Sequence, residues 1–96
     1  MKTTVLLRKS QISKSELARL TNFSRPTIQR WLEDGTGPRR NTDRVVYRGI
    51  LDALEHCLLE KRLPLPPDLS SAERDRRIKA MVREQFDLED IQRLIA

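Results

Sequence analysis

The sequence has one cysteine, one histidine, three glycines and no long apolar run. Because Cys57 is alone, no disulfide can form within the chain, which excludes a secreted disulfide scaffold. The apolar run Val5-Leu6-Leu7 is too short for the core of a signal peptide, and no stretch approaches the ~18 apolar residues of a membrane span. These absences predict a cytoplasmic protein that has no membrane partner.

The sequence also lacks the groupings that bind metals or carry out covalent catalysis. His56 and Cys57 are adjacent, and neighbours on a helix point about 100° apart, so they form neither a metal site nor a catalytic pair. Gly35 and Gly37 are not followed by the Lys-Ser or Lys-Thr of a phosphate-binding loop. We therefore expect no enzyme, no metal and no cofactor, and we expect Cys57 to be a small hydrophobe.

Positive charge is concentrated in the first half of the chain. Residues 1–48 contain 11 basic and 4 acidic side chains, a balance of +7. Residues 49–96 contain 8 basic and 10 acidic side chains, a balance of −2. A solvated helix surface usually mixes the two signs, as the second half does. The excess in the first half therefore favours contact with a polyanion, and nucleic acid is the leading candidate.

Charged residues make up 34% of the chain while glycine and proline are sparse, which is typical of a helix-rich protein. Capping residues and apolar spacing predict five to six short helices. They are expected from Thr3 or Thr4 (as the cap) through Leu7, from Ser13 to about Thr21, from Ser24 to about Leu32, from Asn41 or Thr42 to about Arg62, from Ser70 through Phe86, and from Asp87 through Ile95. With no strand signal and no internal repeat, the predicted fold is all-α, a compact helical bundle.

Three serines are placed to cap helices. Ser13 and Glu16 form the pattern of a capping box, in which the serine accepts from the Glu16 amide and the glutamate reaches back. Ser70 and Glu73 repeat this pattern. Ser24 is expected to cap the third helix, whose first turn tolerates Pro26.

The segment around Asn22 meets the steric requirements of a helix-turn-helix. Two short helices separated by only three residues must pack at a steep angle, with the outer face of the second projecting. Ala18 supplies the small residue where the helices cross, and Asn22, four positions later, tolerates positive φ. Phe23 is placed to plug the turn, and Ile28 and Trp31 are placed to hold the second helix against the core.

The run SELARLTNFSRPTIQRWL, residues 15–32, resembles the helix-turn-helix regulators of the phage lambda repressor and Cro type. With the flanking helices, the resemblance extends loosely from Val5 to about Leu59. The family usually has glycine where this chain has Asn22, a mild departure that leaves the turn feasible. The resemblance implies that the second helix of the motif enters the major groove of double-stranded DNA.

The resemblance places base-reading residues on the outer face of the helix that starts at Ser24. They are Arg25, Pro26, Thr27, Gln29 and Arg30, with Glu33 also turned away from the core. Gln29 suits the N6/N7 edge of adenine, whereas Arg25 or Arg30 suits O6/N7 of guanine. Thr27 suits a thymine methyl group or a phosphate. Two plainer interpretations stay open: Arg30 could be solvated or paired with Asp34, and the motif could be purely structural.

Phosphate contacts are expected from two helix N-termini, where free amides can donate to phosphate oxygens, and from arginines that follow the reading helix. The residues are Ser13, Lys14, Ser15, Ser24, Arg39, Arg40 and Arg44. Arg39 and Arg40 could instead belong to a solvated loop.

The proline-rich stretch of residues 63–67 cannot be helical and predicts a short stiff linker. We therefore divide the chain into a helix-turn-helix DNA-binding domain, residues 1–63, and a linker with C-terminal helices, residues 64–96.

The apolar side chains after residue 77 either pack back onto the long fourth helix or join a second subunit. One short helix reads few base pairs, so we expect a homodimer on a palindrome, with residues 46–63 and 70–96 as interface candidates.

The sequence thus predicts a prokaryotic or phage transcriptional regulator, with a repressor that occupies an operator as the leading form. An activator that touches polymerase is the nearest variant of this function, and two other functions stay open. A DNA-binding accessory factor of recombination would bend DNA without regulating a promoter. An antitoxin would bind a protein partner through residues 64–96 and could also repress its own operon.

Overall fold

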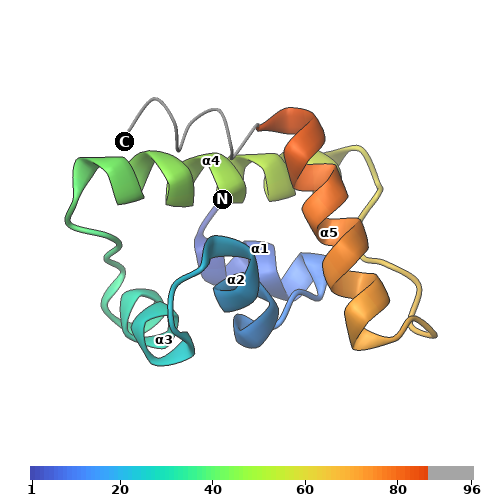
Figure 1. The fold of residues 1–96 in the computed structure, drawn as a ribbon, viewed down its shortest axis with the longest axis horizontal. Helices are drawn as coiled ribbons and strands as arrows, with labels where there is room; N and C mark the ends of the chain where they lie inside the picture. The colour runs from blue at the N-terminus through green and yellow to red at the C-terminus, as the bar shows by residue number, and fades with distance from the viewer. Residues whose placement is uncertain (87–96) are drawn as a thin grey trace.

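The computed structural model describes residues 1–86, and the helix expected from Asp87 lies outside the described residues. Within residues 1–86 the chain forms five α-helices and no strand, which confirms the all-α prediction. The helices are α1 (Thr3–Ser10), α2 (Lys14–Thr21), α3 (Arg25–Asp34), α4 (Asn41–Leu59) and α5 (Ser71–Gln85) (Figure 1).

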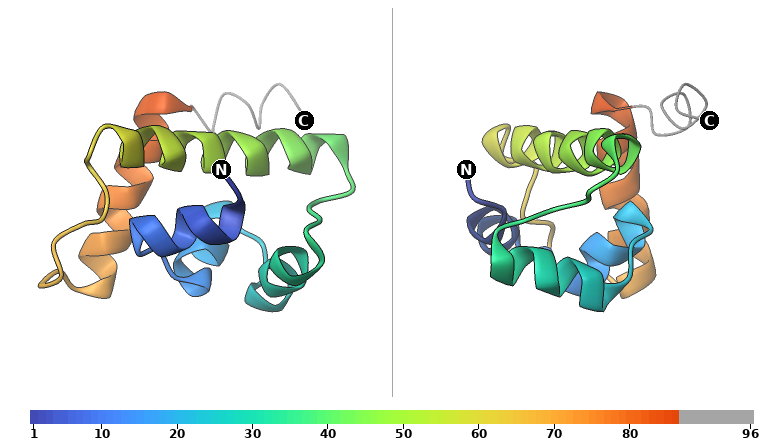
Figure 2. Two further views of the ribbon diagram at one scale, coloured as in Figure 1. Left: turned by 180° about the vertical axis from the view of Figure 1, so that it is seen from behind. Right: turned by 90° about the vertical axis from the view of Figure 1, so that its left-hand side faces the viewer.

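Figure 1 shows α4 along one side of the molecule, with α1, α2 and α3 on the opposite side. Helix α5 crosses one end and packs on both α4 and α2, while α1 packs on α4. Helix α3 packs mainly on α2 and lies at the end far from α5, as the views in Figure 2 confirm. Helix α3, which the sequence predicts to contact the bases, therefore lies at one corner of the bundle.

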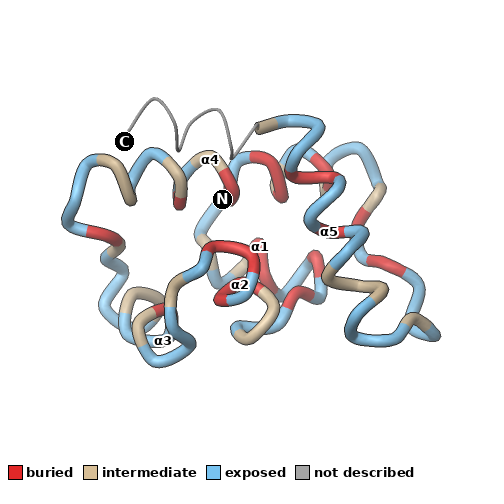
Figure 3. Tube along the Cα trace, viewed as in Figure 1, coloured by how far each residue is buried: buried red, intermediate tan, exposed pale blue. Residues whose placement is uncertain are grey.

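Apolar side chains from all five helices form one core, and buried positions face the centre of the molecule (Figure 3). The largest fully buried side chains are Leu17, Ile28, Ile50, Leu54, Val82, Cys57 and Ser10. Burial raises the pKa of the Cys57 thiol, as expected of a cysteine that fills space in the core. Across residues 1–86, every helix is too short or too polar to span a bilayer, and no cluster of His, Cys, Asp and Glu could hold a metal ion.

The predicted capping box at the start of α2 is confirmed. The Glu16 amide donates to Ser13 Oγ, and the Ser13 amide donates to the Glu16 carboxylate, each over 3.0 Å. At α5 only one half of the predicted box forms, because Ser70 Oγ accepts from the Glu73 amide while the Glu73 carboxylate pairs with arginines of its own helix.

Four details of the helix prediction are wrong. Helix α1 continues to Ser10, three residues beyond the predicted end. Helix α1 follows Lys2, which makes no side-chain cap, so neither threonine caps it. Helix α3 continues through Asp34, two residues beyond the predicted end, because Gly35 takes the left-handed conformation that ends it. Helix α4 ends at Leu59 rather than near Arg62, since the chain turns at Lys61, where φ is 62°.

The proline-rich segment of residues 63–67 is non-helical, as predicted, and it packs on the core. Leu63 and Leu65 are buried while the three prolines between and after them are exposed. Helix α5 buries Ile78, Met81 and Val82 in the same core. The apolar face of α5 therefore packs back onto its own chain, which is one of the two arrangements left open by the sequence.

Asn22 ends α2 with φ of 63°, the left-handed conformation that the helix-turn-helix interpretation requires. This conformation costs most L-residues roughly 1–2 kcal/mol, whereas asparagine and glycine adopt it readily. We expect Asn22→Ala to lower the free energy of unfolding by about 1 kcal/mol in urea denaturation, and Asn22→Gly to be tolerated. Equal losses in the two variants would show that the backbone conformation at this position does not matter.

Candidate nucleic-acid interface

Helices α2 and α3 are joined by the short turn of residues 22–24 and are held in place by aromatic packing. Phe23 contacts Trp31 edge to face at a centroid distance of 5.1 Å, and Trp31 contacts Tyr47 of α4 at 5.2 Å. Ile28 is fully buried beneath α3. The predicted roles of Phe23 in the turn and of Ile28 and Trp31 on the inner face are confirmed, although Trp31 is only partly buried.

The outer face of α3 is open to solvent. It carries Arg25, Pro26, Gln29, Arg30 and Glu33, which are all exposed and line one shallow surface. No side chain from the rest of residues 1–86 lines that surface. Four of the five predicted base-reading residues are therefore brought together on one accessible face.

Thr27, the fifth predicted reading residue, is half-buried and takes part in the helix cap. Its hydroxyl is hydrogen-bonded to Ser24 Oγ at 2.7 Å, and its amide donates to the same oxygen at 3.3 Å. Pro26 has no amide hydrogen to offer. The N-terminus of α3 therefore has fewer free amides for a phosphate than the sequence suggested.

Gln29 is not free in the absence of a ligand. Its Nε2 donates to Glu33 Oε1 over 3.0 Å, one helical turn further along α3. The contact holds the amide of Gln29 along the outer face of the helix. The second N–H of Gln29 Nε2 and its carbonyl oxygen remain, and they are the donor and the acceptor that an adenine edge requires.

The start of α2 presents a second exposed surface. Lys14 is exposed and Ser15 is half-buried, and their amides belong to the first turn, where a helix supplies no acceptor. The Ser13 amide is already used by Glu16. The donors left for a phosphate at this site are therefore the amides of residues 14 and 15, the Ser15 hydroxyl and the Lys14 ammonium group.

Arg39 and Arg40 lie exposed in the loop before α4, and Arg44 lies one turn into that helix. Arg44 Nε donates to the carbonyl oxygen of Pro38 over 2.8 Å. Arg44 therefore ties the loop to α4, and only its terminal nitrogens remain for a phosphate. Sequence reasoning did not foresee this positioning role.

The arginines around α5 and those near α3 differ in their pairing. Those that join helix α5 to its neighbours or lie along it are ion-paired: Arg19, Arg62, Arg74, Arg76 and Arg77. Those near α3 have no ion pair within residues 1–86: Arg25, Arg30, Arg39 and Arg40. The pairing of Arg30 with Asp34 that the sequence left open is absent from this part of the chain. The four arginines at the predicted DNA contacts are therefore not neutralised by an ion pair within residues 1–86.

Comparison with known protein families finds a match to the Cro/C1-type HTH DNA-binding domain over residues 4–45, from α1 into the start of α4. Residues 4–45 form a Cro/C1-type helix-turn-helix domain. The resemblance seen in the sequence is thereby confirmed, and the chain is a DNA-binding protein of the transcription-regulator type. Comparisons with curated proteins and with solved structures find no match.

Helix α5 braces the Cro/C1-type domain from outside the matched segment. Arg74 Nε donates to the Glu16 carboxylate over 2.9 Å, and its terminal nitrogen donates to the carbonyl oxygen of Gln11 over 2.8 Å. Arg19 makes a two-point contact with Asp75 at 2.7 and 3.1 Å. No sequence signal identifies these partners, because opposite charges more than 50 residues apart have many possible pairings.

Glu16 thus serves both the cap of the Cro/C1-type domain's α2 and the contact with α5. Burial opposes its ionisation, but the hydrogen bonds from Arg74 and the Ser13 amide, with the charge of Arg74, outweigh burial and lower its pKa. The stabilisation from Glu16 is therefore complete above the ordinary glutamate pKa of about 4.3 and is lost as pH falls through the lower folded-state pKa.

We expect the urea midpoint of the wild-type protein to fall more steeply between about pH 6 and pH 3 than that of Glu16→Gln. Glutamine cannot ionise, so the variant loses the pH-dependent part of this contact. The two curves should converge at the acidic end. Parallel curves over the whole range would contradict the assignment.

Proposed function

We propose that the protein is a transcriptional repressor that reads a discrete DNA site with the outer face of α3. The observation that carries this proposal is the exposure of Arg25, Gln29 and Arg30 on one face that no other part of residues 1–86 covers. In the major groove each base pair presents its own pattern of donors and acceptors, which side chains on such a face can distinguish. A bound repressor would block polymerase by occupying the operator, and would work in the cytoplasm, beside the DNA.

Each group of side chains has a separate task in this proposal. Arg25 and Arg30 suit O6 and N7 of guanine. Gln29 suits adenine through its carbonyl oxygen and the N–H that Glu33 does not use. The start of α2, together with Arg39 and Arg40, would hold phosphates on either side. Thr27 and Ser24 would contribute through the helix cap that orients α3.

We further propose that two copies bind a palindromic operator. Ten residues of α3 cover too few base pairs for a unique site, and a two-fold dimer doubles the number read. On α4, Val45 and Leu59 are the exposed large apolar side chains, with Leu59 70% exposed. Leu59 lies within the interface candidate 46–63, and Val45 lies one residue before it. The apolar face of α5 is already used inside the chain, so among described residues the segment 46–63 is the stronger candidate.

A protein partner for residues 64–96 remains a second proposal, as for an antitoxin. The buried positions of Leu63, Leu65 and Val82 leave little apolar surface for it before residue 87. A partner would therefore engage the exposed charged face of α5 or residues beyond 86. Copurification of another protein that is lost with Arg76→Glu or with removal of residues 87–96 would favour this role.

The proposed function is tested by footprinting the purified full chain on DNA that adjoins its own gene. We expect one protected site that overlaps a promoter, with an affinity that falls steeply with salt as phosphate contacts release counterions. Protection at recombination ends instead would identify an accessory factor. Binding that survives a large excess of unrelated competitor DNA without a protected site would contradict sequence-specific reading.

A further inference from the structure

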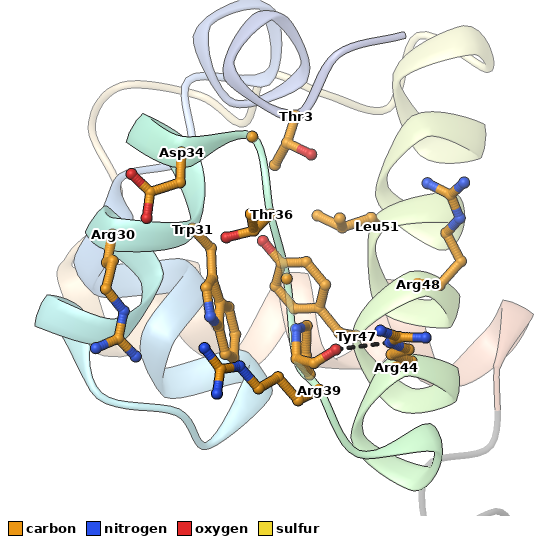
Figure 4. Close-up of a pocket in the computed structure, with 13 residues that line it drawn as sticks. Thr3, Arg30, Trp31, Asp34, Thr36, Arg39, Arg44, Tyr47, Arg48 and Leu51 are labelled. Carbon is orange, nitrogen blue, oxygen red and sulfur yellow. Dashed lines mark hydrogen bonds between the residues drawn. The ribbon is translucent and has the colours of Figure 1, made fainter.

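A groove of about 1020 Å³ separates α3 from α4 and is bridged by the loop of residues 35–40 (Figure 4). Four arginines line it: Arg30 from α3, Arg39 from the loop, and Arg44 and Arg48 from α4. Its floor is formed by Trp31, Tyr47 and Leu51, and Thr3 of α1 reaches its wall. Of these four arginines, Arg30, Arg39 and Arg44 also belong to the predicted DNA contacts, whereas Arg48 does not.

The charge in this groove is not neutralised by the protein. Within residues 1–86, Arg30, Arg39 and Arg48 have no ion pair, and Arg44 donates only to a backbone oxygen. Asp34 is the single carboxylate among the lining residues. The lining residues therefore have a net charge of +3, from four arginines and one aspartate. The volume of the groove is large enough for a small molecule.

The groove is distinct from the reading face of α3. Of the residues that line the two surfaces, only Arg30 borders both. A DNA backbone lying on the rim would use the arginines but not the aromatic and aliphatic floor between the helices. A ligand that carries both anionic groups and an uncharged ring or chain would use rim and floor together.

We propose that the groove between α3 and α4 binds a phosphorylated small molecule of nucleotide size, with its phosphates on Arg39, Arg44 and Arg48 and its uncharged part on Trp31 and Leu51. Guanidinium groups present paired donors that match phosphate oxygens. Because Arg39 and Arg44 are also predicted to hold DNA phosphates, the bound ligand would compete for them and weaken operator binding. That last consequence rests on the proposed function, whereas the binding itself does not.

The test uses the full chain without DNA and follows Trp31, the single tryptophan of the sequence. Inorganic tripolyphosphate and ATP serve as probes at constant ionic strength. We expect a saturable change in Trp31 fluorescence with ATP and a rise in melting temperature with both probes. Arg48→Ala should weaken binding at least about tenfold, because a charge-assisted contact is lost, and Asp34→Asn should tighten it.

The matched control is Arg8→Ala, which removes the same charge from an exposed position of α1 that does not line the groove. Arg8→Ala should leave probe binding unchanged. If Arg8→Ala and Arg48→Ala weakened probe binding equally, the binding would depend only on the overall charge of the protein, and the proposal would be overturned. The absence of saturable probe binding would also overturn it. If the protein binds the probes but does not bind DNA, the groove is still a ligand site and the proposed function is wrong.

A separate measurement distinguishes the groove from the DNA footprint. Arg48→Ala should bind operator DNA as tightly as wild type when no probe is present. If Arg48→Ala weakens DNA binding and lowers its salt dependence while no probe binds, the groove belongs to the phosphate-contact surface. That result would overturn the small-molecule site. Arg48→Lys, which keeps the charge, checks that any loss does not come from misfolding.

Discussion

Replacement of Arg74 by alanine should lower the free energy of unfolding by about 3 kcal/mol, because it leaves a largely buried carboxylate without its cation. The side chains of Arg74 and Glu16 are only 18% and 10% exposed, and Arg74 also holds the Gln11 carbonyl. A loss of this size is a large part of the 5–15 kcal/mol that usually stabilises a small domain. Urea denaturation monitored by circular dichroism measures it directly.

Arg76→Ala is the matched control for this prediction. Arg76 lies on the same helix and pairs with Glu73, but its side chain is 76% exposed. Exposed pairs within a helix contribute about 0.5 kcal/mol or less, so this variant should unfold nearly as wild type does. If the two variants lost equal stability, the contact between α5 and α2 would be no stronger than a surface ion pair.

Gln29→Ala should abolish the preference for one base position of the operator and leave the other positions unchanged. A good two-point contact to adenine contributes about 1–3 kcal/mol of discrimination, so the affinity for the preferred site should fall roughly tenfold to a hundredfold. Affinity for unrelated DNA should stay the same. Titrations against the operator and against single-base variants of it measure both effects.

Arg40→Ala provides the contrast, since a phosphate contact carries no direct sequence information. This variant should weaken binding to all sequences alike and reduce the slope of log affinity against log salt by about 1. Base preferences should survive. If Gln29→Ala and Arg40→Ala behaved identically, the division between base-reading and phosphate-holding residues would be wrong.

The local parts of the site could be predicted because each depends on residues a few positions apart. The capping box of Ser13 and Glu16 spans one helical turn, and the left-handed turn at Asn22 depends on a single residue type. The inner-face spacing of Ile28 and Trp31 follows from the helical period. These features specify the orientation of α3 without reference to the rest of the chain.

The contacts that sequence reasoning missed depend on how separate segments meet. Glu16 and Arg74 are 58 positions apart, and many other pairings of opposite charge were equally compatible with the sequence. The burial of Leu63 and Leu65 was missed because the prolines indicated only a short stiff linker, whereas alternate residues there are buried. The hydrogen bond from Gln29 to Glu33 could have been predicted, because side chains at i and i+4 on a helix commonly pair.

Methylation interference on the operator tests most directly whether the outer face of α3 lies in the major groove. Dimethyl sulfate places a methyl group on guanine N7, where an arginine in the major groove would bond, and on adenine N3 in the minor groove. We predict interference at guanine N7 in each half-site. When Arg30→Ala replaces the wild-type protein, the interference should be lost at one guanine of each half-site. Interference confined to adenine N3, or at no base, would contradict the account.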